Sequence, residues 1–212
     1  GIASRGLGDV YKRQTLSGSN TYSGQTSVTG GTLRIANTEA LGSGSSFSLD
    51  NGTLSFAVSS SGDASDSLVL GSNGGVFDVD AGQSLAFSGV ISGPGSLTKT
   101  GAGELSLTGA NTYTGSTAIT NGAVVVSGSL SDATAVSVSE GTTYEIGADD
   151  TVGSIAGGGA IKLGSSTLSV GGDNSSTEFS GVVSGTGGLA KQGTGTLTVS
   201  YTHLTLPTMW WV

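Results

Sequence analysis

The 212-residue sequence contains no cysteine, which excludes a disulfide framework, a zinc-thiolate site and a thiol nucleophile. It has only two prolines, and its 39 glycines follow no Gly-X-Y period, so it is not a collagen. No apolar run approaches the roughly 20 residues of a membrane-spanning helix, and no signal peptide opens the chain. Only 10% of the residues are charged, with a formal sum of −8. An acidic chain without clustered Lys and Arg is not expected to bind nucleic acid.

Short apolar runs, separated by glycine and small polar residues, recur along the whole chain. The commonest form is a five-residue pattern in which a small or polar residue is followed by x-apolar-x-apolar. Its copies are GTLRI at Gly31, GTLSF at Gly52, GVFDV at Gly75, QSLAF at Gln83, GELSL at Gly103, GAVVV at Gly122, GAIKL at Gly159, STLSV at Ser166 and GTLTV at Gly195. Disordered chains lack such runs. An alternation with a period of two predicts strands with one buried face.

This alternation also predicts which side chains face the core. We expect the apolar positions to point inward: Leu33, Ile35, Leu54, Phe56, Phe77, Val79, Leu105, Leu107, Val124, Val126, Ile161 and Leu163. The residues between them are expected to face solvent: Arg34, Ser55, Asp78, Ser106 and Lys162. Helices are excluded because no i, i+3, i+4, i+7 series persists, and each glycine would cost about 1 kcal/mol in a helix interior. The fold class is therefore all-β.

A longer repeat lies over the short one. Residues 87–107 align with 179–199 at an offset of 92 with 12 identities in 21, and residues 15–35 align with 106–126 at an offset of 91 with 9 identities. Such repeats imply stacked units that cover one another. A β-propeller would need four strands per blade and usually Trp or His signatures, which residues 15–198 lack. We therefore predict a β-solenoid of roughly eight coils, if each takes about 20–25 residues.

The two ends differ in kind from the middle. They hold residue types that are rare or absent elsewhere: Arg5, Lys12, Arg13, His203, Met209, Trp210 and Trp211. Residues 4–14 (SRGLGDVYKRQ) resemble the translation of a sequencing-library adapter, and residues 199–208 (VSYTHLTLPT) resemble its companion read in the reverse direction. We therefore expect residues 1–14 and 199–212 to be adapter-derived and residues 15–198 to form the β-helix. The segment 15–198 keeps 14 acidic and 4 basic residues, a net charge of −10.

The segment from Gly95 to Val126, GSLTKTGAGELSLTGANTYTGSTAITNGAVVV, carries a more specific motif. It resembles the passenger-associated repeat of bacterial autotransporters, which reads G-x-L-x-K-x-G-x-G-x-L-x-L-x-G-x-N-T-Y-x-G-x-T-x-I and continues into a G-x-L strand. A second copy without its front starts at Leu16, and a third without its back runs from Gly187 to Leu197. GAV at Gly122 departs from the usual Gly-Thr-Leu but keeps strand character.

This resemblance implies a right-handed, single-stranded parallel β-helix that is exported by type V secretion. It further implies a structural or adhesive passenger stalk at the cell surface, attached to the outer membrane through a translocator barrel of the parent chain. A host-surface or glycan ligand, or self-association, would be its partner. The alternative is a β-helical carbohydrate-active enzyme, a polysaccharide lyase or glycoside hydrolase. Such an enzyme groups acidic and basic residues on adjacent coils, which four basic residues in 15–198 do not favour.

The search for chemistry predicts no catalytic, cofactor-binding or metal-ligating residue, and no cofactor. The one histidine, His203, lies in a predicted adapter segment. Three carboxylate pairs could serve as acid and base or ligate calcium, but outward or turn-capping positions are favoured for all of them: Asp78/Asp80, Asp63/Asp66 and Asp149/Asp150. The glycines before Lys162, Gly157 to Gly159, lack the spacing of a phosphate loop and predict a coil corner.

Three further features have a structural interpretation. Lys99 and Lys191 occupy the same repeat slot, where we expect a solvated stem lying over the sheet rather than a reactive amine. Tyr22 and Tyr113 could contact a glycan, but we expect them to pack against the next coil because they recur with the repeat. The N-glycosylation patterns are attributed to chance in a bacterial protein: Asn51-Gly52-Thr53 and Asn174-Ser175-Ser176.

Overall fold

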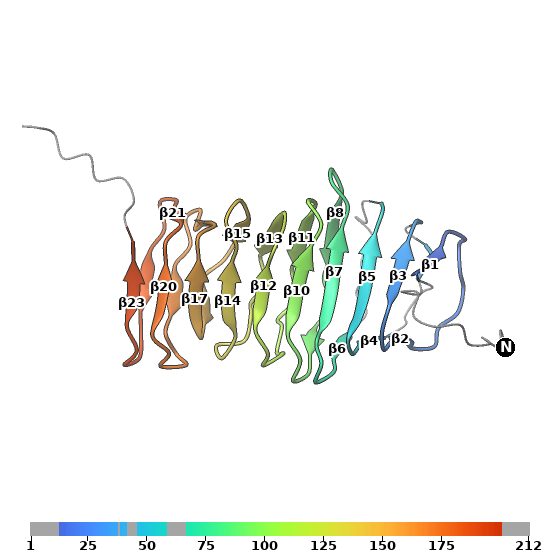
Figure 1. Cartoon of the computed structure of the whole chain (residues 1–212), viewed down its shortest axis with the longest axis horizontal. Coiled ribbons are helices and arrows are strands. Elements are labelled where there is room, and N and C mark those ends of the chain that lie inside the picture. The colour runs from blue at the N-terminus through green and yellow to red at the C-terminus, as the bar shows by residue number, and fades with distance from the viewer. Residues whose placement is uncertain (1–12, 38, 42–45, 59–66, 201–212) are drawn as a thin grey trace, which may run out of the picture.

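The computed structural model describes residues 13–37, 39–41, 46–58 and 67–200. These residues form 23 short strands that stack along one axis from β1 to β23 (Figure 1). Every strand pairing in this described part of the chain is parallel. The prediction of an all-β parallel solenoid is confirmed. None of the described residues forms a helix long and apolar enough to cross a membrane.

The strands form the faces of the solenoid. One face is a ten-stranded sheet of β1 (Arg13–Leu16), β3 (Thr32–Ile35), β5 (Gly52–Phe56), β7 (Gly75–Val79), β10 (Leu97–Thr100), β12 (Thr117–Ile119), β14 (Ala135–Val138), β17 (Ser154–Gly157), β20 (Thr177–Phe179) and β23 (Leu197–Val199). A six-stranded sheet holds β8 (Ser84–Phe87), β11 (Glu104–Leu107), β13 (Ala123–Val126), β15 (Thr143–Ile146), β18 (Ala160–Lys162) and β21 (Val182–Ser184).

Two shorter sheets complete the circuit. One has four strands, β2 (Thr26–Val28), β4 (Phe47–Leu49), β6 (Leu68–Leu70) and β9 (Ile91–Ser92). The other has three strands, β16 (Asp150–Val152), β19 (Leu168–Val170) and β22 (Leu189–Lys191). All nine strands predicted from the five-residue pattern are present.

The register of the ten-stranded sheet gives the length of each coil. Residue 13 pairs with 32, and residue 53 with 76, so successive rungs lie 19 to 23 residues apart. The solenoid makes about nine turns, one more than the predicted eight. The difference arises because several coils close in only 19 or 20 residues.

A single apolar column fills the interior. Of the twelve predicted core residues, eleven are buried, and Leu33 in the second rung is partly buried and packs against the same cluster. Phe77 lies between Phe56 and Phe87, with ring centroids 6.0 and 5.9 Å away. The outward prediction holds for Lys162, which is exposed, and for Arg34, Asp78 and Ser106, which are partly exposed. The expected exposure to solvent is wrong for Ser55, which is only 1% exposed.

Glycine columns allow the corners to pack closely. In one column a Cβ atom at Gly109 would lie 2.4 Å from the carbonyl oxygen of Gly89, and a Cβ at Gly128 would lie 2.1 Å from that of Gly109. No side chain fits at such distances, so glycine is required by contact between coils. At other corners a left-handed conformation is needed, and there Asn51 has φ 63° and Asn174 φ 60°. Gly and Asn thus supply the positive φ angles that these corners require.

The long repeat does not span a whole number of coils. β11 belongs to the six-stranded sheet, whereas its equivalents in the outer copies, β1 and β23, both belong to the ten-stranded sheet. The central copy of the motif is therefore displaced by one face from its two neighbours. After two successive repeats, which together span about nine coils, the motif lies on the ten-stranded sheet again.

Candidate functional site

Four residues that define the motif are buried in the central copy, and we name this set the motif corner: Lys99, Asn111, Tyr113 and Thr117. β10 alternates so that Leu97 and Lys99 face the interior. Asn111 and Tyr113 follow at the next corner, and Thr117 opens β12. All four residues are at most 3% exposed.

Lys99 points into the solenoid, so the predicted solvated stem is wrong. Its side chain has no exposed surface, and Nζ donates to the carbonyl oxygens of Thr100 at 2.6 Å, Gly101 at 2.8 Å and Asn121 at 3.3 Å. The turn at Gly101 (φ 71°) directs these carbonyls inward. A buried ammonium group is tolerated where all three of its protons find acceptors. Lys99 therefore joins one corner to the next coil.

Burial lowers the pKa of Lys99 to about 8, and the negative charge of Asp78 opposes this shift. The outer copy repeats the local part of the arrangement, because Nζ of Lys191 donates to the carbonyls of Gln192 and Gly193. Lys191 is exposed, however. Lys99 and Lys191, which occupy equivalent positions of the motif, therefore form similar hydrogen bonds to the carbonyls of the two residues that follow them, although only Lys99 is buried.

Asn111 connects three coils. Its Oδ1 accepts from the backbone N–H of Ile91 at 3.0 Å, and its Nδ2 donates to the carbonyls of Gly109 at 2.9 Å and Ser129 at 3.0 Å. The equivalent Asn20 uses its Nδ2 in the same direction, toward the carbonyl of Ala40 at 2.7 Å. The amide thereby provides hydrogen-bond partners for backbone groups at the corner, where the sheet pairing is interrupted.

Tyr113 fills the interior beside this amide. It has no exposed surface, and its hydroxyl shares a 2.5 Å hydrogen bond with Oγ1 of Thr117. The prediction that Tyr113 packs against a neighbouring coil is confirmed, since Oγ1 of Thr134 also donates to its carbonyl at 3.1 Å. Burial raises the pKa of Tyr113. Tyr22 repeats the bond to a threonine, Thr26, at 2.9 Å, but its ring is 37% exposed.

A second buried polar group follows the motif corner. Asp150 opens β16 rather than lying in a loop as predicted, and both of its carboxylate oxygens accept from the N–H of Leu130, at 3.3 and 3.2 Å. Burial raises its pKa to about 6, and Asp132 contributes further. The hydroxyl of Tyr144 is buried without a hydrogen-bond partner, and burial raises its pKa well above the usual value. Asp149 caps the next coil by accepting from Thr167 N–H at 2.7 Å.

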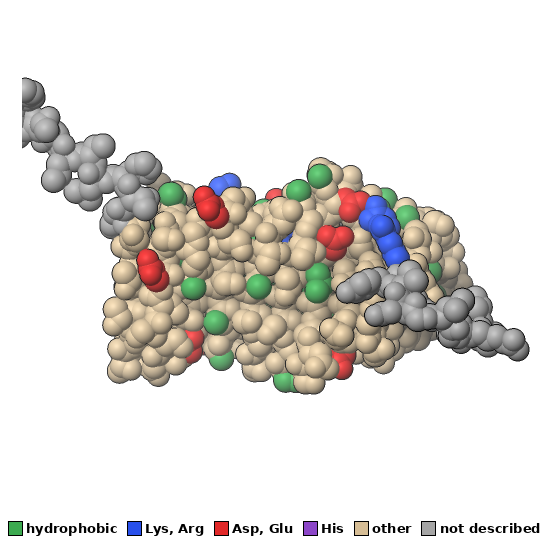
Figure 2. Space-filling view, viewed as in Figure 1, with side chains coloured by type: hydrophobic (Ala, Val, Ile, Leu, Met, Phe, Trp, Pro, Cys, Tyr) green, Lys and Arg blue, Asp and Glu red, His purple; other side chains and the backbone are tan. Residues whose placement is uncertain are grey.

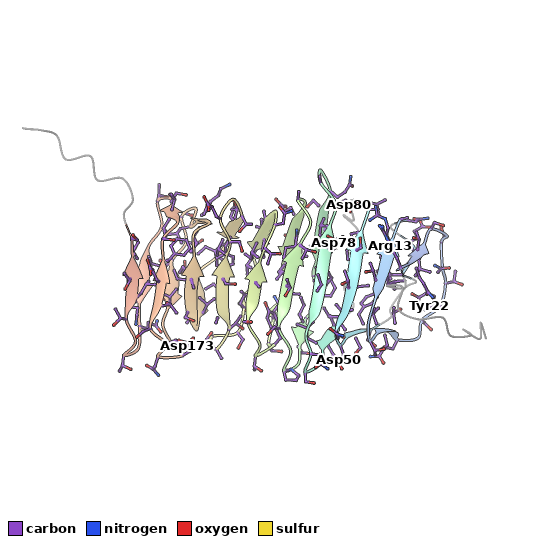
Figure 3. All side chains as sticks on the ribbon, viewed as in Figure 1. Arg13, Tyr22, Asp50, Asp78, Asp80 and Asp173 are labelled. Atoms are coloured by element: carbon purple, nitrogen blue, oxygen red, sulfur yellow. The ribbon has the colours of Figure 1, made fainter. Side chains whose placement is uncertain are left out.

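The outward side chains of the first rungs form a polar network on the ten-stranded sheet. Arg34 pairs with Asp80, and its Nη1 also donates to Ser55 at 3.1 Å. Ser55 in turn donates to Asp78 at 2.9 Å, and so does Thr100 at 3.0 Å. Ser55 is buried because these longer side chains cover it. The two aspartates lie close together at this end (Figure 3).

The Arg34 guanidinium lowers the pKa of Asp80, mainly through their hydrogen bond. All the bonds of this network lie within the protein, which is the outward, structural arrangement that the sequence predicts for Asp78. Asp63, Asp66 and His203 lie outside the described residues. Gly157 to Gly159 form the predicted corner between β17 and β18, and Lys162 meets Glu145 at 3.8 Å on the exposed surface. No group of three potential metal ligands occurs in the described part of the chain.

The inward orientation of Lys99 and the burial of Asp150 were not predicted from the sequence. Lys99 could have been found from its alternation with Leu97, which places both on one face of the strand. Asp150 gave no such signal, because its burial depends on the neighbouring coil that supplies Leu130.

Known proteins share the segments that contain the motif residues. The model of the passenger-associated-transport-repeat family matches residues 13–35 and 97–126. The Adhesin BmaC autotransporter of Brucella suis biovar 1 (strain 1330) is 41% identical over 117 residues, which cover 54% of this chain and 3% of that protein. The chain thus contains the passenger-associated-transport repeat in these two segments. No solved structure matches it.

The matched segments include the residues of the motif corner. Segment 97–126 contains all four of them, and segment 13–35 contains Asn20, Tyr22 and Thr26, which make the corresponding bonds. The repeat therefore includes side chains that join one coil to the next, Lys99 and Asn111, and a Tyr–Thr pair that bonds within its own coil. The chain spans about 3% of the length of the Brucella adhesin it matches.

Proposed function

We propose that this chain is a stalk segment of a passenger that projects from the bacterial surface and takes part in adhesion, without catalysis in these coils. The motif corner carries the proposal. Lys99, Asn111 and Tyr113 are the side chains with the most chemistry to offer, and all three are buried. Lys99 and Asn111 form hydrogen bonds to neighbouring coils, and the hydroxyl of Tyr113 bonds to Thr117 in its own coil. The motif side chains therefore stabilise the solenoid from within, and its outer surface remains available for contacts with other molecules.

The surface itself supports a binding and display role. On the side shown in Figure 2, charged and hydrophobic side chains are scattered among a large majority of other groups, with no extended patch of either kind. Small hydroxyl and amide groups of this sort hydrogen-bond readily to polar partners. A host-surface component or a glycan is the proposed ligand class, and the translocator barrel of the parent protein is the proposed membrane attachment.

The enzymatic alternative has less support. A β-helical lyase or hydrolase needs acidic and basic groups gathered on adjacent coils. In the described residues the ion pairs are Arg34–Asp80 and Lys162–Glu145, which lie far apart along the axis. Asp80 and Arg34 bind each other, Arg34 also donates to Ser55, and Ser55 donates to Asp78, so these groups hold one another in a structural network.

Surface display tests the stalk proposal. The chain, with a short epitope at its N-terminus, is fused ahead of a translocator barrel in a Gram-negative host, and a matched fusion lacks residues 15–198. We expect antibody-coated beads to capture cells that display the full chain several-fold better, because the coils raise the epitope above the surface. Equal capture at equal epitope density would contradict a stalk. Release of unsaturated or reducing sugars from polysaccharides by the purified chain would establish the enzymatic alternative instead.

A further inference from the structure

Three asparagines of the chain, Asn51, Asn73 and Asn121, are each followed directly by a glycine. All three asparagines are exposed. An Asn-Gly pair can react with itself, because the backbone nitrogen of the glycine can attack the side-chain amide carbon of the asparagine and no Cβ atom hinders its approach. The reaction requires that this nitrogen is accessible to solvent and close to the amide carbon. The three pairs can therefore be compared by the surroundings of their glycines.

In the first two pairs the glycine is held inside the solenoid. Gly52 is buried in β5, and Gly74 is buried at the corner before β7. The N–H of Gly74 also donates to the carbonyl oxygen of Gly71 at 2.9 Å, which directs it away from the side chain of Asn73. A buried N–H group does not readily lose its proton to the solvent. The fold thus protects these two pairs.

The third pair lies at the corner between β12 and β13, near the middle of the rod (Figure 1). Gly122 is only partly buried, and its N–H donates to Oδ1 of Asn121 at 2.8 Å. The glycine nitrogen and the amide carbon that carries Oδ1 are therefore neighbours in the folded chain. Because the side chain of Asn121 lies at the surface, a ring formed there needs no space in the core. This pair has the arrangement that ring closure requires.

We propose that Asn121 is a site of self-modification, at which the folded chain forms a succinimide with Gly122 and the ring then opens to isoaspartate. In the first step the nitrogen of Gly122 bonds to Cγ of Asn121, and the side-chain amide group leaves as ammonia with the proton of that nitrogen. In the second step water adds to a ring carbonyl carbon, and the bond from this carbon to the nitrogen breaks. Water is the only co-reactant, and nothing is oxidised or reduced.

Lys99 determines which bond of the ring is broken. Its Nζ donates to the main-chain carbonyl oxygen of Asn121 at 3.3 Å. A hydrogen bond from a cation makes the main-chain carbonyl carbon the more electrophilic of the two ring carbonyls, so that water attacks there. Cleavage at this carbon routes the main chain through the former side chain, which is isoaspartate. It also converts the neutral oxygen that Lys99 binds into a carboxylate.

The product strengthens an existing contact between two coils. Lys99 belongs to β10, and residue 121 follows β12, which pairs with β10 on one side and with β14 on the other. A hydrogen bond between two charged groups is roughly twice as strong as one between neutral groups. The new carboxylate thus binds the ammonium group more firmly than the carbonyl did. Both coils lie within the rod, so the site is independent of its ends.

Incubation of the full 212-residue chain tests the site. The chain is kept at pH 7, below the pKa of Lys99 of about 8, either folded or unfolded in urea. It is then digested at acidic pH and sequenced by electron-transfer fragmentation, which distinguishes isoaspartate from aspartate. We expect Asn121 to react several-fold faster than Asn51 and Asn73 in the folded chain, and all three to react at similar rates in urea. An unmodified Asn121, or equal or faster reaction of Asn51 or Asn73 in the folded chain, would overturn the proposal.

The ratio of isoaspartate to aspartate at position 121 tests the role of Lys99. We expect a higher ratio in the folded chain than in urea, and we expect Lys99→Met to lower it to the value of the unfolded chain. Lys162→Met is the matched control and should keep the ratio of the folded wild type. Thermal unfolding shows whether each variant is folded, and Lys99→Gln replaces Lys99→Met if the latter is not. An unchanged ratio in the folded Lys99 variant would show that Lys99 does not direct the cleavage.

Discussion

At the scale of single residues, Lys99 shows how a cation can serve as core material. Its four-carbon stem replaces an apolar side chain on the inner face of β10, while its ammonium group fills a position where three carbonyl oxygens converge. A neutral side chain of the same length could fill the space but could not donate to these oxygens. The carbonyls would then be buried without partners, and such groups are costly.

Replacing the ammonium group measures this contribution. We expect Lys99→Met to lower the free energy of unfolding by about 1–3 kcal/mol at pH 7, since it leaves buried carbonyl oxygens unpaired. Urea denaturation followed by circular dichroism provides the measurement. Lys162→Met is the matched control, because Lys162 is exposed and should change the value by no more than about 0.5 kcal/mol. Equal effects of the two substitutions would show that Nζ of Lys99 contributes nothing specific.

Asp150 should make the stability depend on pH in the direction opposite to that of most carboxylates. Burial raises its pKa to about 6, so between about pH 4 and pH 6 the folded state holds a proton that the unfolded state has lost. Its contribution is therefore greatest below about pH 4 and falls as the pH rises through 6. Asp150→Asn keeps an acceptor for Leu130 N–H and removes the buried charge.

We expect Asp150→Asn to raise the free energy of unfolding by about 1–2 kcal/mol at pH 7.5 and by much less at pH 4. The quantity to compare is the difference between variant and wild type across the pH series, because Asp80 and Asp173 have lowered pKa values and act in the other direction. Asp149→Asn, next to it and exposed, should leave the pH profile unchanged. A constant difference at all pH values would contradict the assignment to Asp150.

At the scale of elements, the glycine columns allow the coils to pack closely at their corners. Gly109 and Gly24 both occupy the motif, in the central and N-terminal copies respectively, and neither has a left-handed backbone. They differ in their surroundings: a Cβ atom at Gly109 would lie 2.4 Å from the carbonyl oxygen of Gly89, and a Cβ at Gly24 would meet nothing within 4 Å. Any difference in stability between the Gly109→Ala and Gly24→Ala variants therefore measures the effect of contact between coils.

Alanine substitution at these two glycines should give very different results. We expect Gly109→Ala to destabilise the chain by about 1–3 kcal/mol, because the corner must move to admit the methyl group. Gly24→Ala should be neutral or slightly stabilising, since it reduces only the freedom of the unfolded chain. Thermal unfolding of the two variants in parallel provides the comparison. A neutral Gly109→Ala would mean that the corners are loosely packed.

The sequence allowed the longer strands to be predicted better than the short ones. Patterns such as GTLSF and GVFDV alternate over five residues, and β5 and β7 have the predicted bounds. β10 and β12 escaped the pattern because polar residues, Lys99 and Thr117, occupy their inner slots. Lys99 has an acceptor in another coil, Asn121, 22 residues away in the sequence, and Thr117 bonds to the buried Tyr113 four residues before it.

At the scale of the whole molecule, the repeat and the coil have different periods, and this sets the geometry of the rod. The nine turns rise by about 4.8 Å each, or roughly 43 Å in all. The motif returns to the ten-stranded sheet at both ends of that length. The offsets of 91 and 92 were visible in the sequence, but the displacement by one face was not, because it depends on the actual length of each corner.

The end segments should add little to the stability of the rod. Arg13 and Gln14 begin β1 and are exposed, and Val199 ends β23 in the apolar position that the pattern requires there. We expect deletion of residues 1–14 and 199–212 to shift Tm by less than about 2 °C, which corresponds to under about 1 kcal/mol. Differential scanning calorimetry of the two chains is the measurement. A clear loss of stability would show that these segments act as caps.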